Sequence, residues 1–584
     1  MKQSADLKRL LASIDHKSYP AYKDVRGAYD FNTYILSINH VQGDPFASPS
    51  KVSVQIRHTK AGFPAELFDT PWKKTALEDY LLRCFSREIG RLSFKAKGSG
   101  KSGLIATSRP GQEVLSRTAC EIGKNEITAR FEVGFPAFGR TINSGELIRI
   151  FFDFLPGCVE SVFFYRRQNT AEIKKRITLA DDQQFIRNEL KRLDLVSFVA
   201  DGSILPRETG VSDRPMKGSV AFHSPDSLRI TLNLPGHGPI SGMAIRRGIT
   251  LIVGGGYHGK STLLKALESG VYNHIPGDGR EYVITDETAV KLRAEDGRSI
   301  NHVDISLFIR DLPNKKDTTC FSTADASGST SQAAAVIESI EAGTRAFLID
   351  EDTSATNFML RDDLMQRIVS RDKEPITPFI ERARDLYEQA GISTVLVAGS
   401  SGAYFFIADT IIQMDAYRPF DITEMVKNAC EQEVSKPAIQ APGFKLPTAG
   451  RKLAAGGTGR AVGAMALNFG DSRAEAGRNS DRNTRIKVRV HDKHSFQVAK
   501  EPVNLRFVEQ LADSEQTAAL AQMVRYCLEK ELLERCTVQE TVATLLKAYE
   551  TGGLSVFSDA SYAAMGLAMP RVQEIYACLN RFRG

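Results

Sequence analysis

Gly254-Gly-Gly-Tyr-His-Gly-Lys-Ser-Thr262 lies between an apolar run, Ile249 to Val253, and the segment Leu263-Leu-Lys-Ala-Leu267. A buried strand, a glycine-rich loop and an amphipathic helix in this order predict a phosphate-binding P-loop. Glycine lets backbone N–H groups turn toward phosphate oxygens, and the start of the helix adds partial positive charge at the same place. We therefore expect this segment to bind a nucleoside triphosphate, in preference to a chance glycine turn.

Each part of this loop has an expected role. Lys260 is expected to contact the β- and γ-phosphates and to act in catalysis, and the Ser261 hydroxyl is expected to bind Mg²⁺. The expected cofactors are therefore ATP and Mg²⁺. The nucleotide-binding residues predicted from the motif are Gly254, Gly255, Gly256, Tyr257, His258, Gly259, Lys260, Ser261 and Thr262.

A second motif, Ala346-Phe-Leu-Ile-Asp350-Glu351, is an apolar strand that ends in two carboxylates. This pattern is typical of a Walker B element, in which Asp350 would help to hold Mg²⁺. Glu351 would orient or deprotonate the attacking water. An Asp-Glu pair also occurs at ordinary loop starts, but this pair follows Lys260 by ninety residues in a chain that already has a P-loop motif. We expect hydrolysis of ATP.

Between these motifs, Ala326-Ser-Gly-Ser-Thr-Ser-Gln332 precedes a helical run from Ala333 to Ile340. Hydroxyl groups and a glycine at a helix start can hold a phosphate through O–H and N–H donors. The alternative is an ordinary helix N-cap. The position, 23 residues before Asp350, favours nucleotide binding by Ser327, Gly328 and Ser329.

The order of these motifs is that of ABC-type ATPases, and the chain resembles the soluble family described as predicted ATPases of the ABC class. The resemblance covers nearly the whole chain except the region around 445–490. It rests on Gly254–Thr262, His274–Glu281, Asp325–Gln332 and Leu348–Asn357, and extends to His40–Phe46, Gly98–Gly103, Phe198–Gly202 and Val508–Leu511.

The resemblance implies a head-to-tail homodimer. Each nucleotide would lie between Lys260 of one subunit and Ser327-Gly328 of the other, and Asp352–Asn357 would be a D-loop at the seam. Asp278 and Arg280 would either lie beside the nucleotide or be ordinary turn residues.

Two features depart from the general ABC pattern. Gly399-Ser-Ser-Gly402 stands where a switch histidine normally follows a strand. No glutamine occurs in the expected Q-loop region, which reads Asp304–Phe308 and Arg310–Pro313. The hydroxyls of Ser400 or Ser401 would not replace an imidazole as donor and proton carrier, which predicts slow turnover.

The length of 584 residues, with 42% hydrophobic and 25% charged residues, predicts a soluble α/β protein of several domains. We expect an N-terminal α/β domain (1–205), an ABC-type ATPase core (206–425), a basic Gly/Arg-rich linker or arm (426–500) and a C-terminal helical domain (501–584). In the first domain, Lys97-Gly-Ser-Gly-Lys-Ser102 mimics the end of a P-loop without its first glycine or its strand. We expect a basic anion-binding loop or a solvated turn there.

The sequence contains no apolar run near the roughly 20 residues that span a bilayer, and its first residues lack a hydrophobic signal core. The eight cysteines occur singly, with no Cys-x-x-Cys pair. These features predict a cytoplasmic protein with reduced thiols, without a zinc site and without a membrane partner.

The net charge of the chain is +6, and its basic residues are concentrated in residues 445–500. This segment contains twelve Lys and Arg residues and only four Asp and Glu residues. A basic, glycine-rich segment favours a polyanionic partner such as RNA or DNA, with Arg482, Arg485, Lys487 and Arg489 contacting phosphates. A solubilising linker is the alternative. We therefore expect a dimeric ATPase clamp on nucleic acid. The alternative is an ATP-gated protein-interaction module with slow hydrolysis, and a transporter subunit is a more distant possibility.

Overall fold

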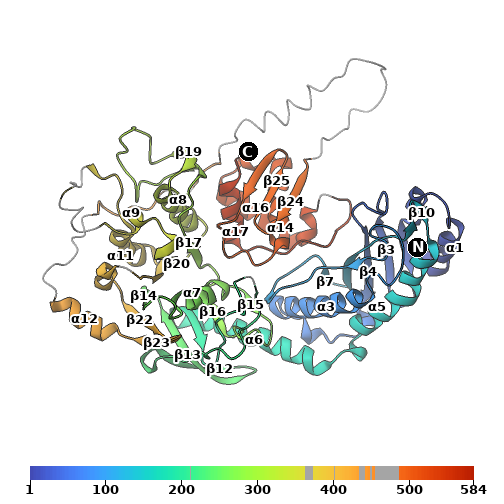
Figure 1. Cartoon of the computed structure of the whole chain (residues 1–584), viewed down its shortest axis with the longest axis horizontal. Helices are drawn as coiled ribbons and strands as arrows, with labels where there is room; N and C mark the ends of the chain where they lie inside the picture. The colour runs from blue at the N-terminus through green and yellow to red at the C-terminus, as the bar shows by residue number, and fades with distance from the viewer. Residues whose placement is uncertain are drawn as a thin grey trace, which may run out of the picture.

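The computed structural model describes residues 1–210, 212–361, 368, 373–399, 401–432, 441–447, 450–453, 486–558 and 560–583. Figure 1 shows an N-terminal domain at one end, a central domain at the other, and a C-terminal domain that lies between them. The eight cysteines are all free thiols. Among the described residues, no helix combines the length and the apolarity needed to cross a membrane.

The N-terminal domain is a mixed sheet covered by helices. The strands follow the order β1 (Lys2–Gln3), β2 (Gly27–Asp30), β3 (Ile35–His40), β4 (Ser50–Arg57), β8 (Glu126–Val133) and β5 (Ile105–Ala106), and β7 (Cys120–Ile122) also pairs with β8. Along β8, buried and half-buried side chains alternate, which places every second residue on the core face. The covering helices are α1 (Ser4–Ser13), α3 (Pro71–Leu92) and α5 (Leu155–Phe163).

Helix α6 (Thr170–Arg192) runs from the N-terminal domain to the central domain. Its 23 residues correspond to about 35 Å of helix. The chain then forms β11 (Leu195–Ala200), a strand of the sheet β12 (Arg229–Leu234), β13 (Gly238–Arg246), β11 and β16 (Val283–Thr285). The expected boundary at 205 therefore lies after a strand that already belongs to the central domain's second sheet.

The main sheet of the central domain carries the two predicted strand motifs. Its order is β17 (Val290–Leu292), β20 (Ala346–Asp350), β21 (Ser393–Val397), β14 (Ile249–Val253), β22 (Thr410–Asp415) and β23 (Arg418–Asp421). All pairs except β22–β23 are parallel. Every residue of β20 and β21 is buried, as expected for a parallel sheet with both faces covered. The described helices of ten residues or more that follow β14 in this domain are α7 (Lys260–Ser269), α8 (Gly328–Glu341), α11 (Phe379–Ala390) and α12 (Thr423–Gln432).

The C-terminal domain is not purely helical, so that part of the predicted fold was wrong. The domain contains an antiparallel sheet of β24 (Val488–Asp492), β25 (Ser495–Val498) and β26 (Glu501–Asn504). Its helices are α14 (Ser514–Glu529), α15 (Leu532–Arg535), α16 (Val538–Gly552) and α17 (Val572–Arg581). Only Phe496, Val498 and Val503 on these strands are fully buried. The alternation of residues in Thr484–Val490 predicts at most one basic strand, and this prediction overlaps β24. The remaining apolar residues stand among charged and polar neighbours, which gives a weak strand pattern, and the first two strands fall inside the expected linker.

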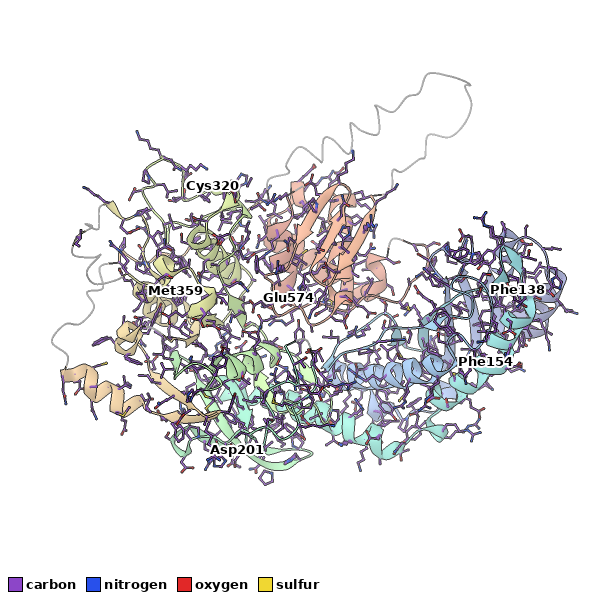
Figure 2. The ribbon with its side chains drawn as sticks, viewed as in Figure 1. Phe138, Phe154, Asp201, Cys320, Met359 and Glu574 are labelled. Carbon is purple, nitrogen blue, oxygen red and sulfur yellow. The ribbon has the colours of Figure 1, made fainter. Side chains whose placement is uncertain are left out.

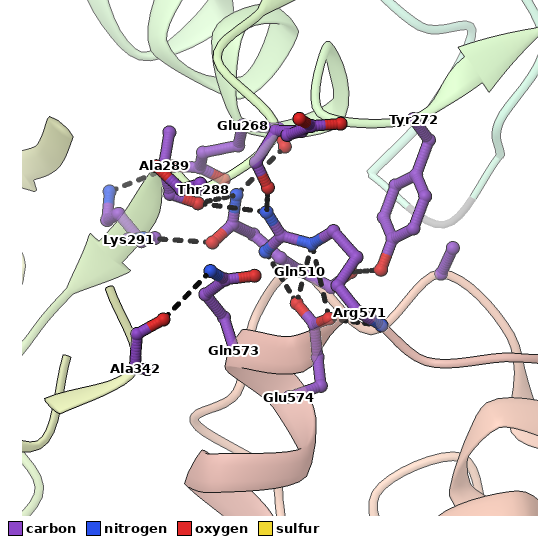
Figure 3. A network of polar contacts seen from close by, with 12 residues as sticks. Glu268, Tyr272, Thr288, Ala289, Lys291, Ala342, Gln510, Arg571, Gln573 and Glu574 are labelled. Atoms are coloured by element: carbon purple, nitrogen blue, oxygen red, sulfur yellow. Dashed lines mark hydrogen bonds and ion pairs between the residues drawn. The ribbon is translucent and has the colours of Figure 1, made fainter. Parts of the chain in front are cut away.

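Buried polar contacts join the C-terminal domain to its neighbours. Figure 3 shows Gln510 accepting a hydrogen bond from the backbone N–H of Lys291 (2.9 Å) and Arg571 donating to the carbonyl of Ala289 (3.0 Å). Arg117 of the N-terminal domain, 2% exposed, pairs with Asp513 and Glu515 at 2.7 Å each. Because separating such pairs would leave buried charges unpaired, the three domains hold one another in place.

Candidate nucleotide site

The loop after β14 has a backbone that only glycine accepts at its two ends. Gly254 has φ 139°, and a Cβ there would lie 2.3 Å from the carbonyl oxygen of Met414. Gly259 has φ 101° and is the N-cap of α7. Glycine is therefore required where the chain leaves the sheet and where it enters the helix.

The backbone donors of this loop point to no protein acceptor. Within the described residues, none of the N–H groups from Gly255 to Thr262 donates a hydrogen bond to the protein. Lys260 Nζ donates to the carbonyl oxygens of Gly254 (2.7 Å) and Gly255 (2.9 Å), so its ammonium group lies against the loop. A run of free N–H groups at the start of a helix, beside an ammonium group, is a site for phosphate.

Two loop side chains have different surroundings. His258 Nδ1 lies 3.0 Å from the backbone nitrogen of Ala416 and 2.8 Å from Asp415 Oδ1, which fastens the loop to the turn after β22. Tyr257 has φ 64° and is 99% exposed. No sequence signal linked His258 to Asp415, because the contact depends on the pairing of β14 with β22.

The second motif ends at the same edge of the sheet. Asp350 and Ile252 are both register partners of Val397, so β20, β21 and β14 end side by side. Asp350 is 8% exposed, and burial raises the pKa of its carboxyl group, an effect that Lys291 partly offsets. A divalent cation beside this carboxylate would offset the cost of burying its charge.

Glu351 is held by the segment that replaces the switch histidine. Its Oε2 accepts a hydrogen bond of 2.7 Å from the backbone N–H of Gly399, the second residue after β21. Ser400 lies outside the described residues, and the Ser401 hydroxyl accepts from the Ala403 N–H (3.2 Å). The backbone at Gly399 thus orients the carboxylate that was predicted to act on water.

The residues predicted to bind Mg²⁺ offer hard oxygen donors, as that ion requires. The Ser261 side chain is exposed and the Asp350 carboxylate is buried at the sheet edge. No cluster of three or more His, Cys, Asp or Glu side chains suited to a metal occurs in the part of the chain that the structure describes. Mg²⁺ usually takes one or two protein ligands together with phosphate oxygens and water, so this donor set fits it.

The third predicted segment starts α8 and is fastened to the predicted D-loop. Ser327 caps the helix, accepting a hydrogen bond of 3.4 Å from the Thr330 N–H. A Cβ at Gly328 would lie 3.2 Å from Asp296 Oδ1. Gln332, fully buried, accepts from the Ala355 N–H (2.9 Å), a bridge that the sequence did not reveal. Ser329 is also buried.

Within one chain, the third segment does not join the P-loop. Among the described residues, no hydrogen bond or ion pair links residues 326–332 to residues 254–262. The structure therefore brings together the first two motifs at one sheet edge and leaves Ser327, Gly328 and Ser329 on a separate helix start.

Asp278 and Arg280 have structural partners. Asp278 is fully buried and pairs with Arg207 (2.8 Å) and with His274 (2.9 Å). Arg280 donates to Ser269 Oγ (3.0 Å) at the last residue of α7. Since α7 is about 15 Å long, these residues lie at the opposite end of the helix from the loop. The turn-residue alternative fits this placement.

The second lysine-containing glycine loop, in the N-terminal domain, has its donors engaged. The N–H groups of Lys97, Ser99, Lys101, Ser102 and Gly103 donate to Glu146, Ala137, Pro45, Ser99 and Gly134 respectively. The segment after it is a two-residue strand, β5, and contains no helix start. The backbone of this loop is therefore unable to hold a phosphate as the P-loop does.

Of the residues predicted to contact nucleic acid, Arg482 and Arg485 lie outside the described residues. Lys487 is exposed just before β24, and Arg489 is exposed on β24. Both side chains are therefore open to solvent, and β24 is the edge strand of its sheet.

Comparison with known proteins finds family matches for three parts of the chain. Residues 4–166 match the family described as "ATPase of the ABC class N-terminal", residues 169–445 match the "P-loop domain" of ABC ATPases, and residues 487–584 match the "MRB1590 C-terminal domain". The uncharacterized protein MJ1628 of Methanocaldococcus jannaschii is 31% identical over 229 residues. That match covers 38% of this chain and half the length of the relative.

Two matched solved structures come from transport systems. One is cbiO1 from Clostridium perfringens, described as part of the ABC transporter complex cbiONQ (13% identity, 41% of this chain, 92% of that chain, TM-score 0.26). The other is MJ1267, described as an ATP-binding cassette of an ABC transporter (11% identity, 41% of this chain, 95% of that chain, TM-score 0.25). Because these TM-scores are low, the family assignment rests on the sequence matches alone. The chain belongs to the ABC-class P-loop ATPases that carry this N-terminal domain.

Proposed function

We propose that this chain binds and hydrolyses ATP with Mg²⁺, as a homodimer that acts on nucleic acid. The observation that carries the proposal is the run of free N–H groups from Gly255 to Thr262, placed at the sheet edge where Asp350 and Glu351 also lie. Triphosphate hydrolysis requires three parts: N–H groups that donate hydrogen bonds to the phosphates, an oxygen ligand for a metal ion, and a carboxylate that activates the attacking water.

The residues would act as follows. The N–H groups of the loop hold the β- and γ-phosphates, and Lys260 exchanges the carbonyls of Gly254 and Gly255 for phosphate oxygens. Ser261 and Asp350 would hold Mg²⁺, which supplies charge neutralisation on the phosphates when bound. Glu351, fixed by the Gly399 N–H, accepts a proton from the attacking water.

A second copy of the chain would complete the site. Ser327 and Gly328 lie at a helix start that makes no polar contact with the P-loop of its own chain, within the described residues. In the proposed head-to-tail dimer, this helix start would contact the γ-phosphate bound by the other copy. Gln332 would transmit the contact to residues 352–357 through its bond to Ala355.

The charge of residues 445–500 supports nucleic acid as the partner, since a local surplus of Lys and Arg binds phosphate backbones without reading sequence. A second candidate is an ATP-gated protein-interaction module with slow hydrolysis. It is favoured by Gly399, which offers Glu351 a backbone N–H where an imidazole is usual.

An ATPase assay of the purified chain tests the proposal. Wild type should hydrolyse ATP with Mg²⁺, and Glu351→Gln should bind ATP but lose about 10²- to 10⁴-fold in kcat, because only the proton acceptor is removed. Size-exclusion chromatography of this variant with ATP should show a dimer. Equal rates for wild type and Glu351→Gln would remove Glu351 from the mechanism.

The same assay separates the two candidates. Single-stranded RNA, single-stranded DNA or duplex DNA should raise the ATPase rate if nucleic acid is the partner. A rate that none of the three changes, combined with ATP-dependent dimerisation, would favour the protein-interaction module. A catalytically competent monomer at nanomolar concentration would contradict the shared site.

A further inference from the structure

Three phenylalanines of the N-terminal domain are unusually exposed. Phe46, Phe94 and Phe138 are 64%, 54% and 63% exposed, and they are the described phenylalanines with more than half of their surface open to solvent. Figure 2 labels Phe138 at the outer end of the N-terminal domain, away from the central domain. Single exposed apolar residues are common, but a group of them marks an interaction site.

The three rings border one loop, Phe94–Gly103. The Phe94 N–H donates to Gly103 (2.7 Å), which closes the loop at its base. Gly100 packs on Phe46 so closely that a Cβ would lie 2.9 Å from the ring. Gly139 follows Phe138, and its N–H donates a hydrogen bond of 2.9 Å to the Ser99 hydroxyl. All three phenylalanines therefore lie in or against the same loop, although they are far apart in sequence.

The loop that carries this surface is rigidly built. A Cβ at Gly103 would lie 2.0 Å from the carbonyl oxygen of Ala96, and one at Gly98 would lie 2.7 Å from that of Ala137. Phe94 is held in the left-handed region at φ 62°, a conformation that bulky residues rarely adopt. The packing of this loop fixes its backbone, and with it the positions from which the side chains project.

Four cations lie on the same loop and on the hairpin that holds Phe138: Lys95, Lys97, Lys101 and Arg140. Within the described residues, none of their side chains forms an ion pair. The neighbouring acids already have partners. Asp44 accepts from the N–H groups of Phe46 (2.8 Å) and Ala47 (3.1 Å), and Glu146 accepts from Lys97 N and pairs with Arg149 (3.6 Å).

We propose that these three phenylalanines and four cations, here called the aromatic–basic face, bind single-stranded nucleic acid. Bases would stack on the phenyl rings and phosphates would contact the cations, as in proteins that bind single strands without reading sequence. A duplex keeps its bases stacked inside, so exposed rings favour a single strand.

This proposal rests on the proposed function and adds what residues 445–500 lack. That segment supplies charge but has few aromatic residues, whereas the aromatic–basic face has both. An acidic protein surface or an anionic membrane would also attract cations and exposed apolar side chains, but leucine would serve either one in place of phenylalanine, whereas stacking on bases requires the ring. The aromatic requirement is therefore the property to test.

The first experiment is fluorescence anisotropy of the full-length chain with labelled dT20 and U20. A base–aromatic stack typically contributes about 5- to 150-fold in affinity, so Phe46→Ala with Phe138→Ala should weaken binding at least about 25-fold. Phe138→Tyr should retain binding and Phe138→Leu should weaken it about 5- to 150-fold, because leucine is apolar but cannot stack. Phe420→Ala, on a residue 48% exposed on β23, is the matched control and should change nothing.

The second experiment measures the salt dependence of the same binding. Replacing Lys95, Lys97, Lys101 and Arg140 together with Gln should reduce the slope of log affinity against log salt by up to about 2.8, at about 0.7 per lost contact with a single strand. The phenylalanine variants should keep the wild-type slope. Their ATPase rate without nucleic acid and their thermal midpoint should also be unchanged, since the rings are exposed and lie outside the nucleotide site.

Three results would overturn the proposal. If Phe138→Leu binds dT20 as tightly as wild type, the rings do not stack on bases. If only the variant Arg482→Gln, Arg485→Gln, Lys487→Gln, Arg489→Gln loses binding, nucleic acid remains the partner but this face is not the site. If the chain binds vesicles of 70% neutral and 30% anionic lipid through these phenylalanines and binds neither oligonucleotide, the face is a membrane site and the nucleic-acid function fails with it.

Discussion

The molecule contains two glycine-rich loops with the sequence Gly-Lys-Ser, and they have opposite hydrogen-bonding states. In the loop 254–262, the N–H groups from Gly255 onward have no protein acceptor among the described residues, and α7 begins at Lys260. In the loop 97–103, five N–H groups are bonded to the protein, and no helix follows. The same three letters therefore give a phosphate site only when a strand and a helix leave the donors free.

The largest difference between the loops should appear when their lysines are replaced. Lys260→Ala removes an ammonium group from the phosphates, and a charge-assisted hydrogen bond of about 1.5–3 kcal/mol corresponds to about 10- to 150-fold weaker ATP binding. Lys101→Ala should leave ATP affinity unchanged. Isothermal titration of both variants with ATP and Mg²⁺ checks this, and an equal loss in the two would erase the distinction.

Matched glycine substitutions should reverse the order of the effects. Gly103→Ala forces a Cβ to within 2.0 Å of a carbonyl oxygen at φ 77°, so we expect a loss of about 2–5 kcal/mol in the stability of the N-terminal domain. Gly256→Ala meets nothing within 4 Å and should fold normally. Its added methyl group lies beside the phosphate donors, so ATP affinity should fall by up to about tenfold.

Thermal unfolding and ATP titration of this pair give the measurements. A stable Gly103→Ala would show that the packing of the 97–103 loop on Ala96 is not required. A Gly256→Ala variant that binds ATP like wild type would mean that the phosphates lie away from this part of the loop.

The smallest expected effect on stability concerns Ser327. Its side chain caps α8, and Ser327→Ala should cost about 1 kcal/mol in unfolding free energy. If a second copy uses the hydroxyl to contact the γ-phosphate, the ATPase rate of Ser327→Ala should fall even at temperatures where the variant is fully folded. Ser327→Thr keeps the hydroxyl and serves as the control. Equal rates in wild type and Ser327→Ala would leave Ser327 as a helix cap alone.

The sequence predicted those parts of the molecule whose residue types leave little choice. Gly254 and Gly259 adopt backbone angles that glycine alone accepts readily, and an unbroken apolar strand before Asp350 is fully buried in a parallel sheet. The contacts of His258 with Asp415, of Gln332 with Ala355 and of Glu351 with Gly399 depend on strand order, which no local pattern encodes.

The C-terminal sheet was missed for a different reason. Strands β24 to β26 are four or five residues long and carry charges on their exposed side, so the sequence indicated at most one basic strand, at 484–490, which overlaps β24. The exposed phenylalanines were equally hidden, because exposure of Phe46, Phe94 and Phe138 follows from the tertiary packing of one loop against two others. Helices with long apolar stripes were the easier elements to recognise.

Hydrogen exchange of backbone amides, measured with and without ATP and Mg²⁺, tests most directly which loop holds the phosphates. The amides of residues 255–262 have no protein acceptor, so ATP should slow their exchange strongly. Five amides of the loop 97–103, those of Lys97, Ser99, Lys101, Ser102 and Gly103, are already bonded and should exchange at the same rate in both states. Unchanged exchange in 255–262, or slowed exchange confined to 97–103, would contradict the assignment of the nucleotide site.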